Sequence, residues 1–169
     1  MGLTPPTVYN AEQPMPVSLR PYRADDLDFL FRLYASIRRH EIAAFGWPEA
    51  QQQAFFRMQF TAQQRWYDQM YPQARHEIVE QNGAAIGRML VECQAQAMLL
   101  VDIALLPEHR GQGIGGELVG QLIEQCDREK VPLRLQVLQA NPALRLYERL
   151  GFVKTGEDQI YFQMEKPPG

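Results

Sequence analysis

The sequence of 169 residues has few cysteines and no long apolar run. Its two cysteines, Cys93 and Cys126, have neither the spacing of metal ligands nor the density of a disulfide-stapled protein. We therefore expect structural thiols and no metal site. No segment approaches the ~18 apolar residues that a membrane-spanning helix needs, and no signal-peptide pattern is present. These absences predict a cytoplasmic protein with no membrane partner.

The chain also lacks an excess of positive charge. Its 17 Lys and Arg residues stand against 20 Asp and Glu residues, so the formal net charge is −3, with both signs mixed along the sequence. A broad phosphate-contacting face is therefore not expected, and neither is a nucleic-acid partner. A small molecule or a protein segment remains as the partner, and a homodimer is left open.

The composition is that of one ordinary globular domain. Hydrophobic residues make up 46% of the chain and charged residues 22%, which is enough for one buried core. Residues 1–16 contain four prolines and no hydrophobic periodicity, so they are predicted to be a flexible lead-in. A single domain is predicted over residues 17–166.

Hydrophobic periodicity and turn residues predict the order of elements along the chain. Strands are predicted over residues 17–21, 76–81, 84–92, 98–105, 133–137, 152–154 and 160–164. Helices are predicted over residues 26–39, 49–70, 115–130 and 142–150. The order β-α-α-β-β-β-α-β-α-β-β indicates an α+β fold, with a mixed sheet between helices.

Local signals add detail to three of these elements. Asp25 precedes the first helix and is predicted to be its N-cap. The dipeptide Asn82-Gly83 favours the positive φ angles of a two-residue type I′ turn between two strands. The nearly continuous apolar run over 98–105 predicts a central strand that is buried on both faces.

Four glycines within six residues separate a predicted strand from a predicted helix: Gly111, Gly113, Gly115 and Gly116. Glycine lets several backbone N–H groups converge on one anion, and a helix N-terminus adds partial positive charge. The segment therefore predicts a pyrophosphate-binding loop. It also matches the dinucleotide fingerprint, but residues 130–134 lack the acidic ribose ligand, so an NAD-dependent enzyme is a weaker alternative.

Two longer motifs make this interpretation more specific. Residues 104–115, Ala-Leu-Leu-Pro-Glu-His-Arg-Gly-Gln-Gly-Ile-Gly, resemble the cofactor motif of the GCN5-related N-acetyltransferase (GNAT) family. Residues 141–152, Asn-Pro-Ala-Leu-Arg-Leu-Tyr-Glu-Arg-Leu-Gly-Phe, are similar to a second motif of that family. The resemblance implies a three-layer α/β/α sandwich whose mixed, mainly antiparallel sheet splays between the fourth and fifth strands. It also implies acetyl-CoA as co-substrate and acetyl transfer to a primary amine by direct attack in a ternary complex.

The same resemblance assigns roles to single residues. The main chain of Ile103, Ala104 and Leu105 would pair with the pantetheine arm, with a free N–H near Leu105 polarising the thioester carbonyl. Tyr147 resembles the family's general acid, although a tyrosine that only packs in the core is the alternative. Asn141 would bond the pantetheine or the neighbouring strand, or cap the helix that follows it. The pyrophosphate would lie against Arg110, Gly111, Gln112, Gly113, Ile114, Gly115 and Gly116.

The general base is not identified by the motifs. Leu99 and Gln136 occupy positions where members of the family carry glutamate, and neither can accept a proton. Asp102 is a candidate because it interrupts an apolar strand beside the cofactor path. Glu41 and His40 are further candidates, because the family's acceptor site is lined by the first helices and their loop.

The acceptor is a small-molecule amine or a protein amine, and the sequence does not separate the two. Glu41, Trp47 and Asp102 are the residues predicted to contact it. The missing glutamates leave a second hypothesis open, in which the chain is a non-catalytic acyl-CoA-binding module.

Overall fold

The computed structural model describes residues 16–169. The flexible lead-in predicted for residues 1–16 lies outside this part of the chain, apart from Pro16. The strands are β1 (Val17–Pro21), β2 (Arg75–Gln81), β3 (Ala84–Cys93), β4 (Met98–Leu105), β5 (Leu133–Leu138), β6 (Val153–Glu157) and β7 (Tyr161–Lys166). The α-helices are α1 (Leu27–Ile42), α2 (Glu49–Met70), α3 (Ile114–Glu129) and α4 (Leu144–Arg149). Short 3-10 helices are η1 (Ala24–Asp26), η2 (Ala43–Phe45) and η3 (Pro107–His109).

The predicted order of elements is confirmed, and several boundaries agree closely with the prediction. Helix α2 begins directly after Pro48 and ends before Tyr71, as the proline signals on either side indicate. Asn82 and Gly83 have φ angles of 55° and 74° and form the predicted two-residue connection between β2 and β3. Local backbone preferences thus determine where α2 begins and ends and where β2 turns into β3.

The prediction that Asp25 caps the first helix is wrong. A 3-10 turn precedes α1, and Asp26 is the residue before its first turn. The Asp26 carboxylate accepts hydrogen bonds from both terminal nitrogens of Arg20, at 2.8 and 2.7 Å, and from the backbone N–H of Arg23 at 2.7 Å. The hydrogen bonds from Arg20 hold the pKa of Asp26 below its usual value. The Asp26 carboxylate therefore links β1 to the turn that precedes α1.

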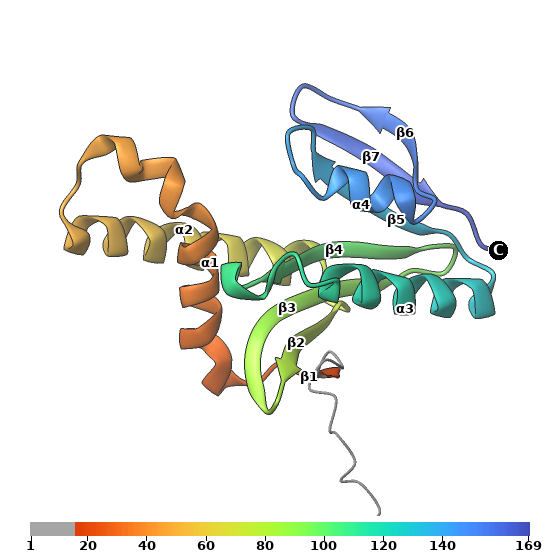
Figure 1. Ribbon diagram of the computed structural model, residues 1–169, viewed down its shortest axis with the longest axis horizontal. Coiled ribbons are helices and arrows are strands. Elements are labelled where there is room, and N and C mark those ends of the chain that lie inside the picture. Colours follow the sequence, from red (N-terminus) through yellow and green to blue (C-terminus); the bar gives the residue numbers. More distant parts are fainter. Residues whose placement is uncertain (1–15) are drawn as a thin grey trace, which may run out of the picture.

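The strands form one seven-stranded sheet in the order β1-β2-β3-β4-β5-β7-β6. Every neighbouring pair is antiparallel except β4 and β5, which are parallel. Their parallel pairing covers only residues 98–100 of β4 and 133–135 of β5. Beyond that point the two strands diverge, as Figure 1 shows, and the predicted splay between the fourth and fifth strands is confirmed.

A β-bulge lies where the two strands separate. In the register of β3 with β4, Leu90 pairs with Asp102 and Val91 pairs with Leu100, so Val101 is the extra residue. A bulge bends its strand and increases the local twist. Leu100 is also the last residue of β4 that pairs with β5. The bulge therefore directs the C-terminal half of β4 away from β5.

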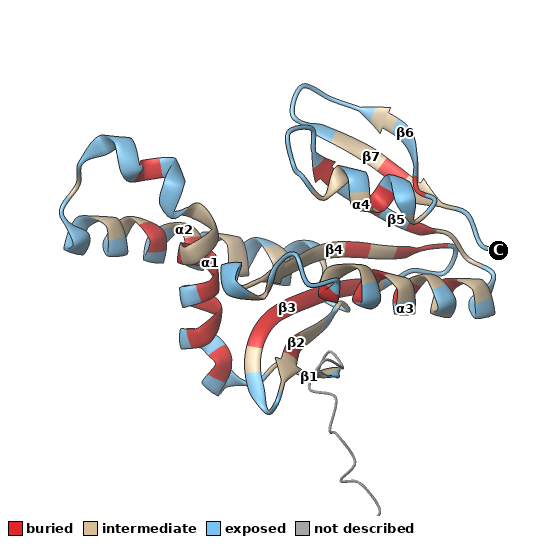
Figure 2. Cartoon of the chain, viewed as in Figure 1, coloured by how far each residue is buried: buried red, intermediate tan, exposed pale blue. Residues whose placement is uncertain are grey.

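Helices cover both faces of the sheet. One buried cluster joins residues of α3 and α4 to one face, and a second cluster joins α1 and α2 to the other face. Figure 2 shows the buried residues running along β3 and on α1. The arrangement is the predicted three-layer α/β/α sandwich. Among the described residues no helix has the length and apolar character needed to cross a membrane.

The prediction that residues 98–105 are buried on both faces is wrong. Met98 and Leu100, on one face of the first half, are buried, whereas Leu99 on the other face and residues 101–105 are only half-buried. The reason is the divergence of β5, which leaves the second half of β4 without a neighbour on one edge. The apolar run therefore lines an opening in the sheet.

Candidate functional site

A cavity of about 730 Å³ lies at the divergence of β4 and β5. Residues from α1, α2, β3, β4, the Gly-rich loop, α3 and α4 line it. Of the residues predicted to bind the cofactor, those that line it are Ile103, Ala104, Leu105, Arg110, Gly111, Gly113, Ile114, Gly115, Gly116 and Asn141. The topology thus brings the two motifs, separated in sequence by α3 and β5, to one cleft.

The loop between β4 and α3 has the backbone geometry of an anion cradle. Gly111 and Gly113 have φ angles of 71° and 83°, which only glycine adopts without strain. Gly113 is also the N-cap of α3, so the first N–H groups of that helix have no partner within the helix and face the loop side. These donors and the helix dipole together favour a bound anion.

Two long side chains fold back onto the main chain around this loop. The Nε atom of Arg110 donates to the carbonyl of Leu105 at 3.0 Å, which ties the loop to the end of β4. The Nε2 atom of Gln112 donates to the carbonyl of Glu108 at 3.0 Å. Gln112 is exposed and is not among the residues that line the cavity, so its predicted contact with a cofactor stays a prediction.

The glycines in the first turn of α3 allow α4 to approach closely. A Cβ atom on Gly116 would lie 3.4 Å from a methyl carbon of Leu146, and one on Gly115 would lie 3.9 Å away from it. Helix α4 therefore packs against the phosphate-loop end of α3. This contact places Tyr147, the next residue of α4, at the cavity.

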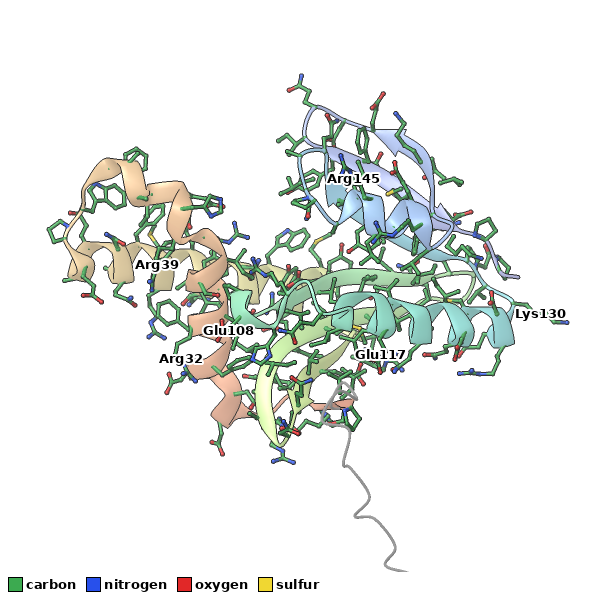
Figure 3. The ribbon with its side chains drawn as sticks, viewed as in Figure 1. Arg32, Arg39, Glu108, Glu117, Lys130 and Arg145 are labelled. Atoms are coloured by element: carbon green, nitrogen blue, oxygen red, sulfur yellow. The ribbon has the colours of Figure 1, made fainter. Side chains whose placement is uncertain are left out.

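The charges that line the cavity are mainly positive. Arginines 38, 88, 110 and 149 line it, whereas Asp102 is the one carboxylate among its described lining residues. Glu108 and Glu117, which are labelled in Figure 3, are exposed and do not line it. A cleft with this balance of charge favours an anionic ligand.

Tyr147 is buried, with 7% of its surface exposed, and its ring packs edge-on against Phe152 at a centroid distance of 5.6 Å. Its hydroxyl makes no hydrogen bond with another described residue. Burial, with a smaller contribution from the negative charge of Asp102, raises the pKa of Tyr147 to about 12. The phenol therefore stays protonated near neutral pH and can act as a donor to a group in the cavity.

Asn141 is exposed and lines the cavity. Its Oδ1 atom accepts a hydrogen bond from the backbone N–H of Ala143 at 2.9 Å. The side chain thus organises the turn before α4, while its NH₂ group has no hydrogen bond to another described residue. The N-cap of α4 is Ala143, so Asn141 stabilises the turn before the helix and is not its cap, and its predicted bond to the pantetheine stays a prediction.

The acceptor candidates lie in different places. Asp102 lines the cavity. Glu41 and Trp47 do not; Glu41 is exposed and pairs with Arg38 at 3.6 Å, and the Trp47 ring stacks on Phe45 with centroids 5.2 Å apart. Because Arg38 itself lines the cavity, Glu41 reaches the site only through this arginine. The contacts predicted for Glu41 and Trp47 stay predictions.

The sequence reasoning missed a polar network on β3. Arg88 is buried, with 4% exposed, and its Nε and Nη2 atoms lie 2.8 and 2.7 Å from Oδ2 of Asp102. Its Nη1 and Nη2 atoms also donate to the side-chain oxygens of Gln64, at 2.9 Å, and Gln63, at 3.1 Å. Tyr67 completes the network, with its ring 5.1 Å from the guanidinium. The signal in the sequence was one arginine within the apolar strand 84–92.

The sequence of this chain is similar to that of a known N-acetyltransferase. Over 90 residues the chain is 34% identical to the [ribosomal protein bS18]-alanine N-acetyltransferase of Haemophilus influenzae, a match that covers 53% of this chain and 60% of that protein. The chain thus spans about three fifths of the length of this curated relative.

Two solved structures share the whole architecture. The PaiA N-acetyltransferase of Thermoplasma acidophilum, solved in complex with coenzyme A, superposes with a TM-score of 0.69 at 19% identity, over 90% of this chain and 99% of that one. The ribosomal-protein-S18-alanine N-acetyltransferase of Escherichia coli superposes with a TM-score of 0.63 at 20% identity, over 90% of this chain and 94% of that one. At these identities the likeness concerns the fold.

The fold and its opened sheet define the class of GNAT-type α/β/α sandwiches. Residues 72–154, which run from the end of α2 to β6, match the family model of the acetyltransferase (GNAT) domain. The match to this family model confirms the resemblance to the GNAT family that the two motifs indicate.

Proposed function

We propose that this protein transfers an acetyl group from acetyl-CoA to a primary amine, with residues 17–166 acting as one catalytic domain. The observation that carries the proposal is the single cleft that joins the glycine cradle, the open edge of β4 and the hydroxyl-bearing side chain of Tyr147. An anion site, an extended binding edge and a proton donor are the parts that thioester chemistry requires.

The residues present fit acetyl-CoA as co-substrate, which supplies an activated acetyl thioester when bound. The N–H groups from Gly111 to Gly116 hold the pyrophosphate, and the positive φ angles of Gly111 and Gly113 keep that cradle free of side chains. The unpaired edge of Ile103, Ala104 and Leu105 offers main-chain groups to an extended ligand. Arg110 adds positive charge beside the cradle.

Tyr147 acts in this proposal as a hydrogen-bond donor to the departing sulfur. Thiols have pKa values of about 8.5 and that of Tyr147 is about 12, so complete proton transfer to the thiolate is uphill by ~5 kcal/mol. A hydrogen bond to the developing negative charge requires no such transfer. The proton that the thiolate finally takes up then comes from solvent.

The acceptor is a primary amine on a small molecule or on a protein. The name of the Haemophilus influenzae relative gives a protein alanine as its acceptor, which supports the inclusion of protein N-termini among the candidates. We further propose a cytoplasmic location, which the two free thiols of Cys93 and Cys126 support.

The proposal is tested by combining a binding and a turnover measurement. Calorimetric titration should show acetyl-CoA binding to the purified protein, and NAD should not bind. Release of free thiol from acetyl-CoA should then depend on both the protein and an added amine. Thiol release that is equal with and without every amine tested would contradict the proposal.

A second candidate is a non-catalytic acyl-CoA-binding module. The observation that favours it is the absence of glutamate at Leu99 and Gln136; Leu99 is half-buried opposite Arg134 of β5, and Gln136 is exposed. The same experiment separates the two functions, because a binding module would bind acetyl-CoA tightly while no amine would stimulate thiol release.

A further inference from the structure

Arg88 is unusual among the charged residues of this protein because it is buried in the middle of a central strand. Burying a charge is costly unless the group is paired and hydrogen-bonded. Arg88 satisfies this condition through Asp102 on β4 and through Gln63 and Gln64 on α2. The network therefore links two strands and one helix at the wall of the cavity that both Arg88 and Asp102 line.

Asp102 is held in a way that leaves part of it available. Both contacts from Arg88 go to the same oxygen, Oδ2. No described residue donates a hydrogen bond to Oδ1, and 26% of the side chain is exposed. Asp102 also directly follows Val101, the extra residue of the bulge, so it lies where β4 turns away from β5. One carboxylate oxygen in a fixed orientation is thus open to the cavity.

The part of α1 that lines the same cavity is apolar. Leu30, Leu33 and Ile37 follow one another there at three- and four-residue spacing along one face of the helix. Leu30 and Leu33 are almost fully buried, and Ile37 is half-buried and offers the accessible surface. Arg38 lies at this side as well, with its guanidinium carbon 4.5 Å from the centre of the Tyr34 ring. The acceptor side therefore offers one carboxylate oxygen, an apolar helix face and the guanidinium of Arg38, which also pairs with Glu41 at 3.6 Å.

We infer that the acceptor is a monoamine with an apolar substituent, whose nitrogen hydrogen-bonds Oδ1 of Asp102, and that Arg88 is the residue that positions Asp102. The substituent lies against Ile37, at the edge of the apolar face of α1. A second ammonium group finds no second carboxylate among the described lining residues, and Glu41, which lies beyond them, is already paired with Arg38, so diamines are poor acceptors. This inference rests on the proposed acetyl transfer.

Asp102 has a defined part in the transfer step. The amine nitrogen forms a bond to the acetyl carbon while the carbon–sulfur bond breaks, so positive charge develops on nitrogen and negative charge on sulfur. The carboxylate stabilises the positive nitrogen, which then loses one proton to water. The thiolate gains one proton from solvent, so charge and protons balance.

Two matched pairs of acceptors test the substrate class. We expect kcat/KM for n-hexylamine to exceed that for 1,6-diaminohexane, which differs by one added ammonium group, by at least tenfold. The same ordering is expected for leucinamide over lysinamide. Equal or reversed preference in both pairs overturns the inference, as does failure to acetylate either monoamine while other amines are acetylated.

Variants of the pair test the role of the two residues. Asp102→Asn keeps an oxygen that can accept from Arg88 but removes the charge, and it should lower kcat/KM for n-hexylamine at least tenfold, with acetyl-CoA affinity within about threefold of wild type. Arg88→Gln should have a similar effect, and Arg88→Lys should restore part of the activity. In Arg88→Gln/Asp102→Asn the losses should not add, because Arg88 acts through Asp102.

Unaltered kinetics in Asp102→Asn would overturn the assignment of this residue. Additive losses in the double variant, or equal loss of acetyl-CoA binding in every variant, would reduce Arg88 to a role in stability. These failures differ from failure of the proposed function, in which the wild-type protein acetylates no amine at all.

Discussion

Gly115 offers the sharpest test of the anion cradle at the scale of one residue. It lies in the first turn of α3 without a positive φ angle, and an added Cβ atom would meet only Leu146, at 3.9 Å. We expect Gly115→Glu to bind acetyl-CoA at least tenfold more weakly than the neutral, equally large Gly115→Gln, a difference of about 1.4 kcal/mol. Calorimetric titration of both variants measures it.

Comparison of Gly115→Glu with Gly115→Gln separates the electrostatic effect from the steric effect. If Gly115→Gln loses as much affinity as Gly115→Glu, bulk and not charge is responsible, and the anion cradle is contradicted. Gly113 is less suitable for this purpose, because its φ angle of 83° would strain any other residue.

Tyr147→Phe should lower kcat roughly 10- to 100-fold and leave acetyl-CoA affinity nearly unchanged, since the hydroxyl is needed mainly as charge develops on sulfur. The pKa of Tyr147 is raised to about 12, so the phenol is protonated at every pH up to about 10. The pH profiles of kcat for the wild type and the variant should therefore have the same shape over that range. A wild-type limb that disappears in the variant would show that Tyr147 titrates during turnover.

The roles of residues within a local motif could be predicted from the sequence. The roles of residues that act through contacts between distant parts of the chain could not. The glycine segment is contiguous and lies directly at the start of a helix, so its chemistry is legible in the sequence. Arg88 contacts Asp102 and Gln63 only because β3, β4 and α2 pack together. No local sequence pattern predicts these contacts. Asp25 failed for a local reason, because the neighbouring Asp26 binds Arg20 and is the residue that precedes α1.

At the scale of elements, the contact between β3 and β4 depends on Gly87. An added Cβ atom there would collide with the carbonyl oxygen of Ala104 and lie 2.7 Å from a methyl carbon of Leu105. We expect Gly87→Ala to lower the free energy of unfolding by about 1–3 kcal/mol and to weaken acetyl-CoA binding, because the β4 edge lines the cleft. Urea denaturation and calorimetric titration measure the two effects.

The matched control is Gly120→Ala within α3, where an added Cβ atom meets nothing within 4 Å. Alanine there should raise the free energy of unfolding by roughly 0.5–1 kcal/mol. If Gly87→Ala has the same free energy of unfolding as this control, the close contact of β3 with β4 at Gly87 does not contribute to stability and the prediction is contradicted.

Most element boundaries followed from the sequence because capping, proline and turn residues act locally. The burial of β4 did not, since a continuous apolar run looks the same whether a strand has neighbours on both edges or opens onto a cavity. The pairing of β4 with β5 over only three residues depends on the arrangement of the whole sheet and on the bulge at Val101. Hydrophobic patterning does not predict it, and only the family resemblance indicated that the two strands diverge.

For the whole molecule, His76 links stability to pH. Its ring stacks on Tyr22 at 4.6 Å, and its Nε2 atom is buried with no hydrogen-bond partner among the described residues. Burial, together with the positive charge of Arg88, lowers the pKa of His76 to about 4. The unfolded chain therefore binds the extra proton between pH values of about 6.5 and 4, and stability falls as the pH decreases through that range.

We expect the wild type to lose about 2 kcal/mol more free energy of unfolding than His76→Phe between pH 7 and pH 5. Phenylalanine keeps an aromatic ring to stack on Tyr22 but has no group that titrates. Urea denaturation of both proteins at the two pH values measures the difference. Equal losses would show that His76 is protonated alike in the folded and unfolded chains.

The described sheet consists of two parts, β1–β4 and β5–β7, whose strands pair with each other only over residues 98–100 and 133–135, extended by a hydrogen bond from the backbone N–H of Met98 to the carbonyl of Pro132. One hydrophobic cluster also spans both parts and packs Val91 of the first with Leu133 and Met164 of the second. Ladder and cluster together set the angle between the two parts, and this angle sets how far the β4 edge lies from Tyr147. A substitution within the ladder therefore changes the geometry of the cleft without changing any residue that lines it.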